Sequence, residues 1–112
     1  MVLNCSWMAV LHKYKDIQQI ILNIRFKVKP GKKETFRDHL FTMADAMSKE
    51  TSFVNAIIHD LEHPDDIVIY EIWNGTQESW LQEEFPRSYR KDYEDVLSEM
   101  LEDRLISWLT PL

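Results

Sequence analysis

The sequence predicts an α+β fold in which strands and helical regions alternate in the order βαββαβ. Three observations predict it: strict apolar alternation at residues 19–29, two further β-rich stretches at 51–59 and 67–73, and helical periodicity after the first and the third stretch. Right-handed crossovers place both helical regions on the same side of the sheet. The expected fold is therefore a four-stranded antiparallel sheet with helices on one face, the ferredoxin-like arrangement.

The stretch Ile67–Trp73 is the strand around which the rest of the chain is organised. All of its residues except Glu71 are β-branched or aromatic, and both of its faces are mostly apolar. This composition is typical of a central strand that is covered on both sides. The Asn-Gly dipeptide at 74–75 ends the strand, and Thr76 is placed to cap the helix that follows.

The first half of the fold is predicted from two simple periodicities. Gln19–Lys29 alternates apolar residues strictly and stops at a Pro-Gly dipeptide, which indicates the first strand. Lys32–Glu50 has apolar residues at helical spacing on one face, which indicates the first helix. The residues of that face are Phe36, Leu40, Met43, Ala44 and Met47.

The second half begins with a hairpin. Thr51–His59 is predicted to be the second strand, and a turn-rich connection joins it to the central strand in an antiparallel pair. The helical pattern that starts after Thr76 breaks at Phe85-Pro86 and resumes over Ser88–Leu105. Residues Leu105–Thr110 are expected to form a short last strand that completes the sheet.

The length and charge of the chain limit the kinds of protein it can be. A chain of 112 residues fits one domain, assigned to 17–112 after an N-terminal leader at 1–16. The net charge of −6 makes nucleic acid and anionic membrane surfaces poor partners. Because the single Cys5 can form no intrachain disulfide and no apolar run reaches the ~20 residues of a membrane span, a cytoplasmic protein is expected.

The two middle strands predict a partner. Neither face of the hairpin formed by Thr51–His59 and Ile67–Trp73 is polar, although helices can cover only one face of the sheet. An uncovered apolar face is unfavourable in water. We therefore expect a homodimer in which two sheets pack face to face.

Three features of the chain together resemble a known family. They are the Pro-Gly turn within Phe26–Leu40, the Glu-x-Trp ending of Ile67–Trp73, and Pro86 thirteen residues after that Trp. Over residues 19–112 the sequence resembles the antibiotic biosynthesis monooxygenase family of dimeric α+β barrels. It looks most similar to the small quinol-monooxygenase-like members.

The resemblance implies a function. Family members bind flat polycyclic or quinol-type substrates between sheet and helices, and several oxygenate them with O₂ and no metal or flavin. The expected function is therefore a cofactor-independent monooxygenase that acts on a small aromatic substrate. Two alternatives stay open: a non-catalytic small-ligand binding domain, and a haem-binding or haem-degrading protein. Gln82 stands where the quinol enzymes often carry a His, and no His lies between Trp80 and Leu105, where haem degraders carry their iron ligand.

Three residues are the catalytic candidates. Asn23 is expected to bind a substrate oxygen, as a first-strand Asn does in the resembling enzymes. Trp80 offers a flat apolar wall and an indole N–H, and the Tyr89 hydroxyl could polarise a quinone oxygen. Each can equally be an ordinary core or interface residue. The substrate-binding candidates are Trp73, Phe85, Tyr93 and His59.

Charged and metal-binding residue types give weaker signals. Glu71 lies within a buried strand, and we expect it to pair with Arg25 on a neighbouring strand, because an unpaired buried carboxyl would have a raised pKa. It could alternatively serve as a base. The four His residues show no paired metal-ligand spacing, so no metal site is predicted.

Overall fold

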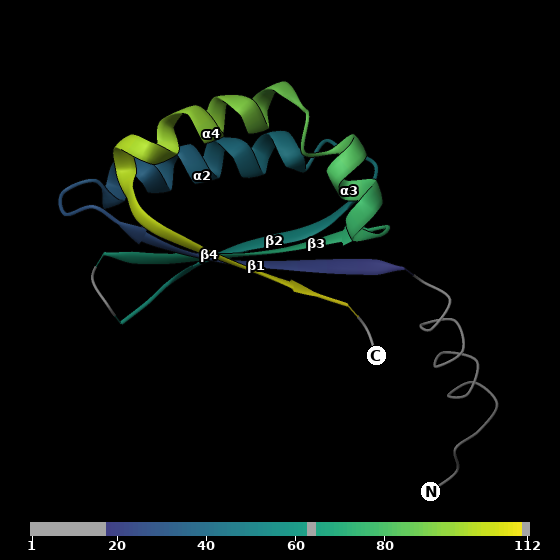
Figure 1. Cartoon of the computed structure of the whole chain (residues 1–112), viewed down its shortest axis with the longest axis horizontal. Coiled ribbons are helices and arrows are strands. Elements are labelled where there is room, and N and C mark those ends of the chain that lie inside the picture. Colours follow the sequence, from purple (N-terminus) through teal and green to yellow (C-terminus); the bar gives the residue numbers. More distant parts are fainter. Residues whose placement is uncertain (1–17, 63–64, 111–112) are drawn as a thin grey trace, which may run out of the picture.

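The computed structural model describes residues 18–62 and 65–110 (Figure 1). The predicted leader at 1–16, together with Cys5, lies outside the described residues. The elements are β1 (Gln19–Val28), α2 (Lys33–Met47), β2 (Phe53–Asp60), β3 (Asp66–Asn74), α3 (Gln77–Glu83), α4 (Ser88–Met100) and β4 (Leu101–Leu109).

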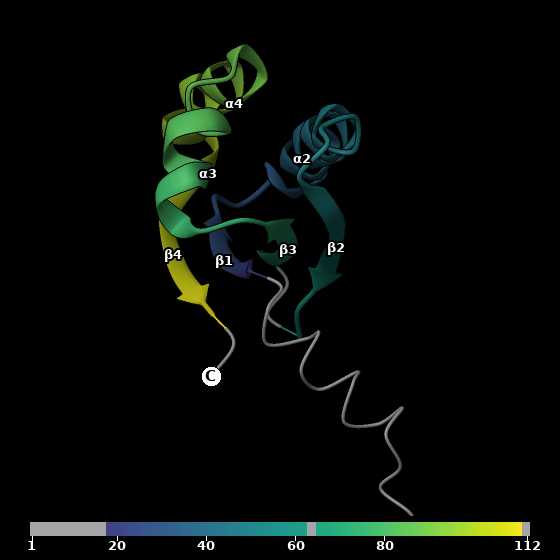
Figure 2. The ribbon, with the colours of Figure 1, turned by 90° about the vertical axis from the view of Figure 1, so that its right-hand side faces the viewer.

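The four strands form one sheet in the order β2-β3-β1-β4, and every neighbouring pair is antiparallel. The three helices of the described residues lie on one side of this sheet, with α2 above β2 and β3 and with α3 and α4 above β4 (Figures 1 and 2). The predicted α+β ferredoxin-like fold is therefore confirmed, and Ile67–Trp73 does lie in a central strand. In the part of the chain that the structure describes, no helix is long and apolar enough to cross a membrane.

The boundary between the last helix and the last strand was predicted too late. The sequence favours helix through Leu105, but α4 ends at Met100 and β4 begins with the next residue. Leu101 pairs with Val28, and Lys29 N–H donates to the Met100 carbonyl at 2.8 Å. Pairing along the whole of β1 satisfies more backbone groups than another turn of exposed helix, so the tertiary contact prevails over the local helical pattern.

The start of β2 departs from simple strand alternation. Alternation would place Phe53 and Ala56 on opposite faces, but the register shifts between Phe53 and Asn55. This irregularity turns the Phe53 ring toward the core, where it meets Trp73 edge-on with 5.3 Å between ring centroids. One extra residue in a strand reverses the side on which its neighbours point.

The core fills the layer between helices and sheet. Alternate residues of β1 and β3 point into it and meet one face of α2, as the periodicities predict. Phe26 and Phe36 are fully buried and pack edge-to-face at 4.9 Å. The core residues are Ile20, Leu22, Ile24, Phe26, Val28, Phe36, Leu40, Met43, Met47, Ile67, Ile69, Trp73, Trp80, Tyr93, Leu97 and Met100.

The opposite sheet face is largely open and carries both apolar and charged side chains. No helix of the described residues covers it (Figure 2). Leu105 is 62% exposed and Ile57 45% exposed, whereas Val68, Tyr70 and Ile72 of the central strand are half-buried. The homodimer expected on this face stays a prediction.

Candidate functional site

A buried arginine lies at the centre of the layer between helices and sheet. Arg90 of α4 is only 4% exposed, although no arginine was expected there. Its Nε donates to Glu84 Oε2 at 2.7 Å, and its Nη2 donates to Glu71 Oε1 at 2.9 Å. Because the two carboxylates come from β3 and from the end of α3, this network ties the helices to the sheet.

The turn before α3 brings the aromatic residues to this arginine. Gly75 has φ +119°, a backbone conformation that residues with a side chain rarely adopt. A Cβ added there would lie 2.6 Å from Ser79 Oγ. Thr76 then caps the helix as predicted: its Oγ1 accepts from Ser79 N–H at 3.1 Å, and Ser79 Oγ accepts from Thr76 N–H at 2.9 Å. The reciprocal cap fixes where α3 starts and so places Trp80 one turn later.

Three aromatic rings surround the Arg90 guanidinium. Its central carbon lies 4.9 Å from the centroid of Trp80, 5.7 Å from that of Trp73 and 5.9 Å from that of Tyr89. A cation this close to a ring face is attracted by the electron density of the ring, most strongly when both are removed from water. These three residues were all predicted site residues, and the structure brings them together.

The network is closed by hydrogen bonds to its aromatic members. Trp73 Nε1 donates to Glu71 Oε1 at 2.9 Å, and the Tyr89 hydroxyl donates to Glu84 Oε2. Burial and then the hydrogen bond to Glu84 raise the pKa of Tyr89 above its ordinary value. Burial alone would lower the pKa of Arg90, but the two carboxylates raise it instead, so this arginine stays charged.

Trp80 also belongs to an aromatic cluster that reaches the surface. Its ring lies 5.2 Å from that of Trp108 on β4 and 6.1 Å from that of Phe85, measured between centroids. Phe85 is 51% exposed, whereas Trp80 is 8% exposed. The Trp80 indole N–H is buried and has no hydrogen-bond partner among the described residues. A buried donor without a partner is costly, so this atom is the first place to look for a ligand contact.

The predicted partner of Glu71 was wrong. Arg25 lies on the other sheet face, where its Nε and Nη2 both donate to Asp66 Oδ2, at 3.0 and 2.6 Å. Glu71 is fully buried and pairs with Arg90, which a different element supplies. The structural ion pair expected for Glu71 is therefore present with a different cation.

Three predicted residues lie away from Arg90. Asn23 pairs with Tyr70 and Ser107 in the sheet, and its strand neighbours on both sides are core residues. Its side chain therefore points to the open face, and Asn23 does not share a site with Trp80. Tyr93 is buried against Phe26 and Phe36 at 6.4 and 6.3 Å.

His59, the last of the predicted residues, lies on the edge strand β2. It is exposed and lines a cavity of about 300 Å³ between α2 and the sheet edge, together with Phe41, Arg37 and Ile58. This cavity involves none of the other predicted site residues. His59 is therefore separate from the aromatic cluster around Trp80.

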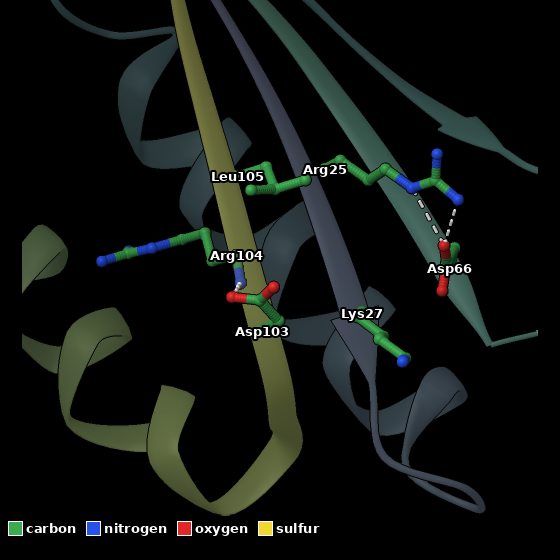
Figure 3. A pocket seen from close by; sticks show the side chains of 6 residues that line it. All are labelled: Arg25, Lys27, Asp66, Asp103, Arg104 and Leu105. Carbon is green, nitrogen blue, oxygen red and sulfur yellow. Dashed lines mark hydrogen bonds and ion pairs between the residues drawn. The ribbon is translucent and has the colours of Figure 1, made fainter.

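A charged cavity opens at one end of the uncovered sheet face (Figure 3). It measures about 310 Å³, and Figure 3 shows Arg25 extending from β1 toward Asp66 on β3. The charges around it are matched: Asp66 holds Arg25, and Lys27 Nζ lies 3.6 Å from Glu102 Oε2. This cavity is therefore separate from the aromatic cluster, which lies on the other side of the sheet.

Sequence reasoning missed Arg90, Glu84 and Trp108. Glu84 looks like an ordinary exposed charge in a helical region. Arg90 stands at helical spacing with the buried Tyr93, Leu97 and Met100, but its charge argues against burial. Trp108 gave a weak signal, because an aromatic residue next to the polar Ser107 in the last strand can face the core. Across residues 18–62 and 65–110, no group of three or more His, Cys, Asp or Glu side chains could hold a metal ion.

The cluster around Trp80 combines aromatic surface with one buried hydrogen-bond donor. The rings of Trp80, Phe85 and Trp108 supply apolar area, and the Trp80 N–H supplies a donor in a region with little water. Gln82, which occupies the position of the family's frequent His, is exposed on α3 and approaches Glu78 Oε1 at 3.5 Å. It does not join the cluster.

Comparison with known proteins agrees with this fold. The family model for antibiotic biosynthesis monooxygenase matches residues 19–84. A comparison with curated protein sequences finds no significant match. Among solved structures, a protein from Shewanella oneidensis superposes with a TM-score of 0.77 at 18% identity, covering 86% of this chain and 95% of its own.

Two further solved structures carry descriptions. One, from Nitrosomonas europaea, is named provisionally as an antibiotic biosynthesis monooxygenase and has a TM-score of 0.74 at 14% identity, covering 84% of this chain and 90% of its own. The other, a Bacteroides thetaiotaomicron protein of unknown function described as a possible oxidoreductase, has a TM-score of 0.74 at 16% identity, with coverages of 84% and 98%. At such identities the likeness establishes the fold.

Proposed function

Because this chain belongs to the antibiotic biosynthesis monooxygenase family, we propose that it is a cofactor-independent monooxygenase acting on a quinol-like or polycyclic aromatic small molecule. One observation carries the proposal: the buried Trp80 N–H has no partner and lies in an aromatic cluster that opens to solvent through Phe85. A ring oxygen of the substrate would accept this hydrogen bond while its ring packs against the aromatic residues.

The chemistry asks little of the protein. A substrate anion is itself the reductant of O₂: when a quinol becomes a hydroxyquinone, one oxygen atom is inserted into a ring C–H bond, and the other leaves as water with the two hydrogens of the quinol hydroxyls. The Trp80 N–H would stabilise the oxyanion that develops on the ring oxygen, in a site with few competing waters. The alternative of a binding domain without turnover has one observation in its favour, because Gln82 supplies no base where related enzymes often carry His.

We further propose that the protein acts as a homodimer. The open sheet face carries half-exposed apolar side chains on all four strands, and covering it would remove them from water. A second copy of the same face is self-complementary by symmetry. The substrate site on the helix side would remain accessible in such a dimer.

The proposal is tested by O₂ uptake with menadiol and related quinols, measured above the rate without protein. Trp80→Phe keeps an aromatic ring but removes the N–H, so turnover should fall by about tenfold or more, the value of one charged or buried hydrogen bond. Trp80→Ala should also weaken binding, measured by quenching of Trp fluorescence. Tyr70→Phe, on the opposite sheet face, is the matched control and should behave as wild type.

Two results would redirect the assignment. If quinols bind but never accelerate O₂ consumption, the protein is a binding domain on this fold. If wild type and Trp80→Ala are quenched equally, the ligand does not occupy the Trp80 cluster.

A further inference from the structure

We infer that Arg90 is a positioning residue that fixes the orientation of Trp80, and that it is not itself a ligand-binding arginine. The inference rests on the proposed function, because it names the residue that holds the proposed hydrogen-bond donor, the Trp80 N–H, in place. Its evidence comes from the contacts of Arg90, Trp80 and Arg87.

The donors of Arg90 are almost fully used inside the protein. A guanidinium has five N–H groups. Nε and one Nη2 hydrogen go to Glu84 and Glu71, the second Nη2 contact is to Met47 Sδ, and Nη1 contacts Met43 Sδ. Little remains with which to bind a substrate oxygen, so the guanidinium acts on the site through the rings beside it.

The two carboxylates fix the plane of the guanidinium. Glu84 and Glu71 bind different nitrogen atoms of it, Nε at 2.7 Å and Nη2 at 2.9 Å, and both are buried. A planar group held at two of its nitrogen atoms cannot rotate freely. Trp80, whose centroid lies 4.9 Å away, therefore meets a rigid cationic surface.

Trp80 is held from a second direction by Trp108. The two indoles meet nearly perpendicularly, at 79° and 5.2 Å between centroids. With Arg90 near its face and Trp108 beside it, the Trp80 ring has little freedom to turn. Its N–H is then kept away from protein acceptors, which explains how a buried donor stays without a partner.

Arg87 provides a matched comparison within the same network. It also bonds Glu84, at 3.0 Å, and bonds Glu50 at 3.1 Å, but it is a partly exposed side chain and contacts none of the rings around Arg90. If Arg90 served only to bind Glu84, Arg90 and Arg87 would have the same role and would differ only in how deeply they are buried. The ring contacts are what set Arg90 apart.

The test labels the protein with 5-fluorotryptophan and follows the Trp80 resonance by ¹⁹F NMR, assigned with Trp80→Phe. Arg90→Lys keeps the charge but loses the planar fork, so the Trp80 resonance should shift or broaden. Menadiol affinity, measured by fluorescence quenching, should fall about fivefold, in keeping with loss of a desolvated cation–π contact. Arg87→Lys should leave the resonance unchanged and the affinity within twofold.

A folded Arg90→Lys protein with an unchanged Trp80 resonance would overturn the inference and leave Arg90 a purely structural ion pair. If Arg90→Lys does not fold, Glu84→Gln takes its place, because it weakens the hold on Nε while keeping an acceptor. It should shift the Trp80 resonance in the same direction by a smaller amount, and no shift would equally refute the role. A wild type that does not bind menadiol would count against the proposed function only, since the resonance reports positioning without ligand.

Discussion

Replacing Glu71 with Gln tests the buried network most directly. The change keeps the shape of the side chain and removes one charge. Glu71 is fully buried and accepts from Arg90 Nη2 and Trp73 Nε1, both at 2.9 Å. A hydrogen bond to a charged group contributes about 1.5–3 kcal/mol.

The cost has an upper limit set by what Arg90 retains. Breaking a buried ion pair costs about 3–5 kcal/mol when the remaining charge has no other partner. Arg90 keeps Glu84 at 2.7 Å, and a Gln side chain still offers an oxygen to Trp73. We therefore expect Glu71→Gln to lower the free energy of unfolding by about 2 kcal/mol. This lies within the range for one hydrogen bond to a charged group and below the cost of leaving a buried charge without any partner.

The assay is thermal and urea unfolding followed by circular dichroism. For a domain of about 100 residues, 1 kcal/mol shifts the Tm by roughly 4–8 °C, so the expected fall is roughly 8–16 °C. Glu102→Gln is the control: its pair with Lys27, at 3.6 Å, is exposed, and it should change stability by less than about 0.5 kcal/mol.

A double-mutant cycle with Arg90→Met completes the test. That change leaves the buried Glu71 without a cation, whereas Glu84 keeps Arg87 at 3.0 Å, and it should cost more than Glu71→Gln, about 3–5 kcal/mol. The double mutant should cost less than the sum of the two, because the second change relieves an unpaired charge. If Glu71→Gln costs no more than Glu102→Gln, or if the two changes are additive, then Glu71 and Arg90 do not form a coupled buried pair.

Three further predictions follow from other parts of the structure. Burial raises the pKa of Tyr89 and Tyr93 above the ordinary 10.0, so the unfolded chain loses these protons at lower pH than the folded protein and stability should fall as pH rises above 10.0. Absorbance at about 295 nm should show both phenols still protonated at pH ~11, and titration of both at the ordinary pKa would refute this. Leu105→Lys or Ile57→Lys should convert a dimer of twice 13.4 kDa into a monomer by sedimentation, whereas a wild-type monomer at micromolar concentration would exclude the face-to-face dimer. Thr76→Ala should destabilise the protein by about 1 kcal/mol in urea unfolding, and no change would show that the cap is dispensable.

Part of the candidate site could be predicted from the sequence. Trp73, Trp80 and Tyr89 were identified because aromatic residues at a strand end, after a tight turn and on the next helix are drawn to the same place by local geometry. Asn23 was grouped with them although strand alternation already puts it on the face opposite Leu22 and Ile24. Strand alternation alone places the Asn23 side chain on the open face, but the prediction followed the resemblance to related enzymes instead.

The sequence by itself determined the order of the elements, the central position of Ile67–Trp73 and the start of α3 at its Thr76 cap. These depend on side-chain period, turn residues and caps, which act within a few positions along the chain. Only the tertiary structure decided that α4 yields to β4 at Leu101, since that choice depends on hydrogen bonds to β1.

The tertiary structure also decided which cation meets Glu71. Arg25 and Arg90 carry the same charge, and the sequence around them does not say which of the two lies near Glu71. Arg25 points to the open face beside Asp66, whereas the path of α3 and α4 carries Arg90 across the sheet to Glu71. Pairing between distant residues is fixed by sheet register and by helix packing, and local sequence patterns contain neither.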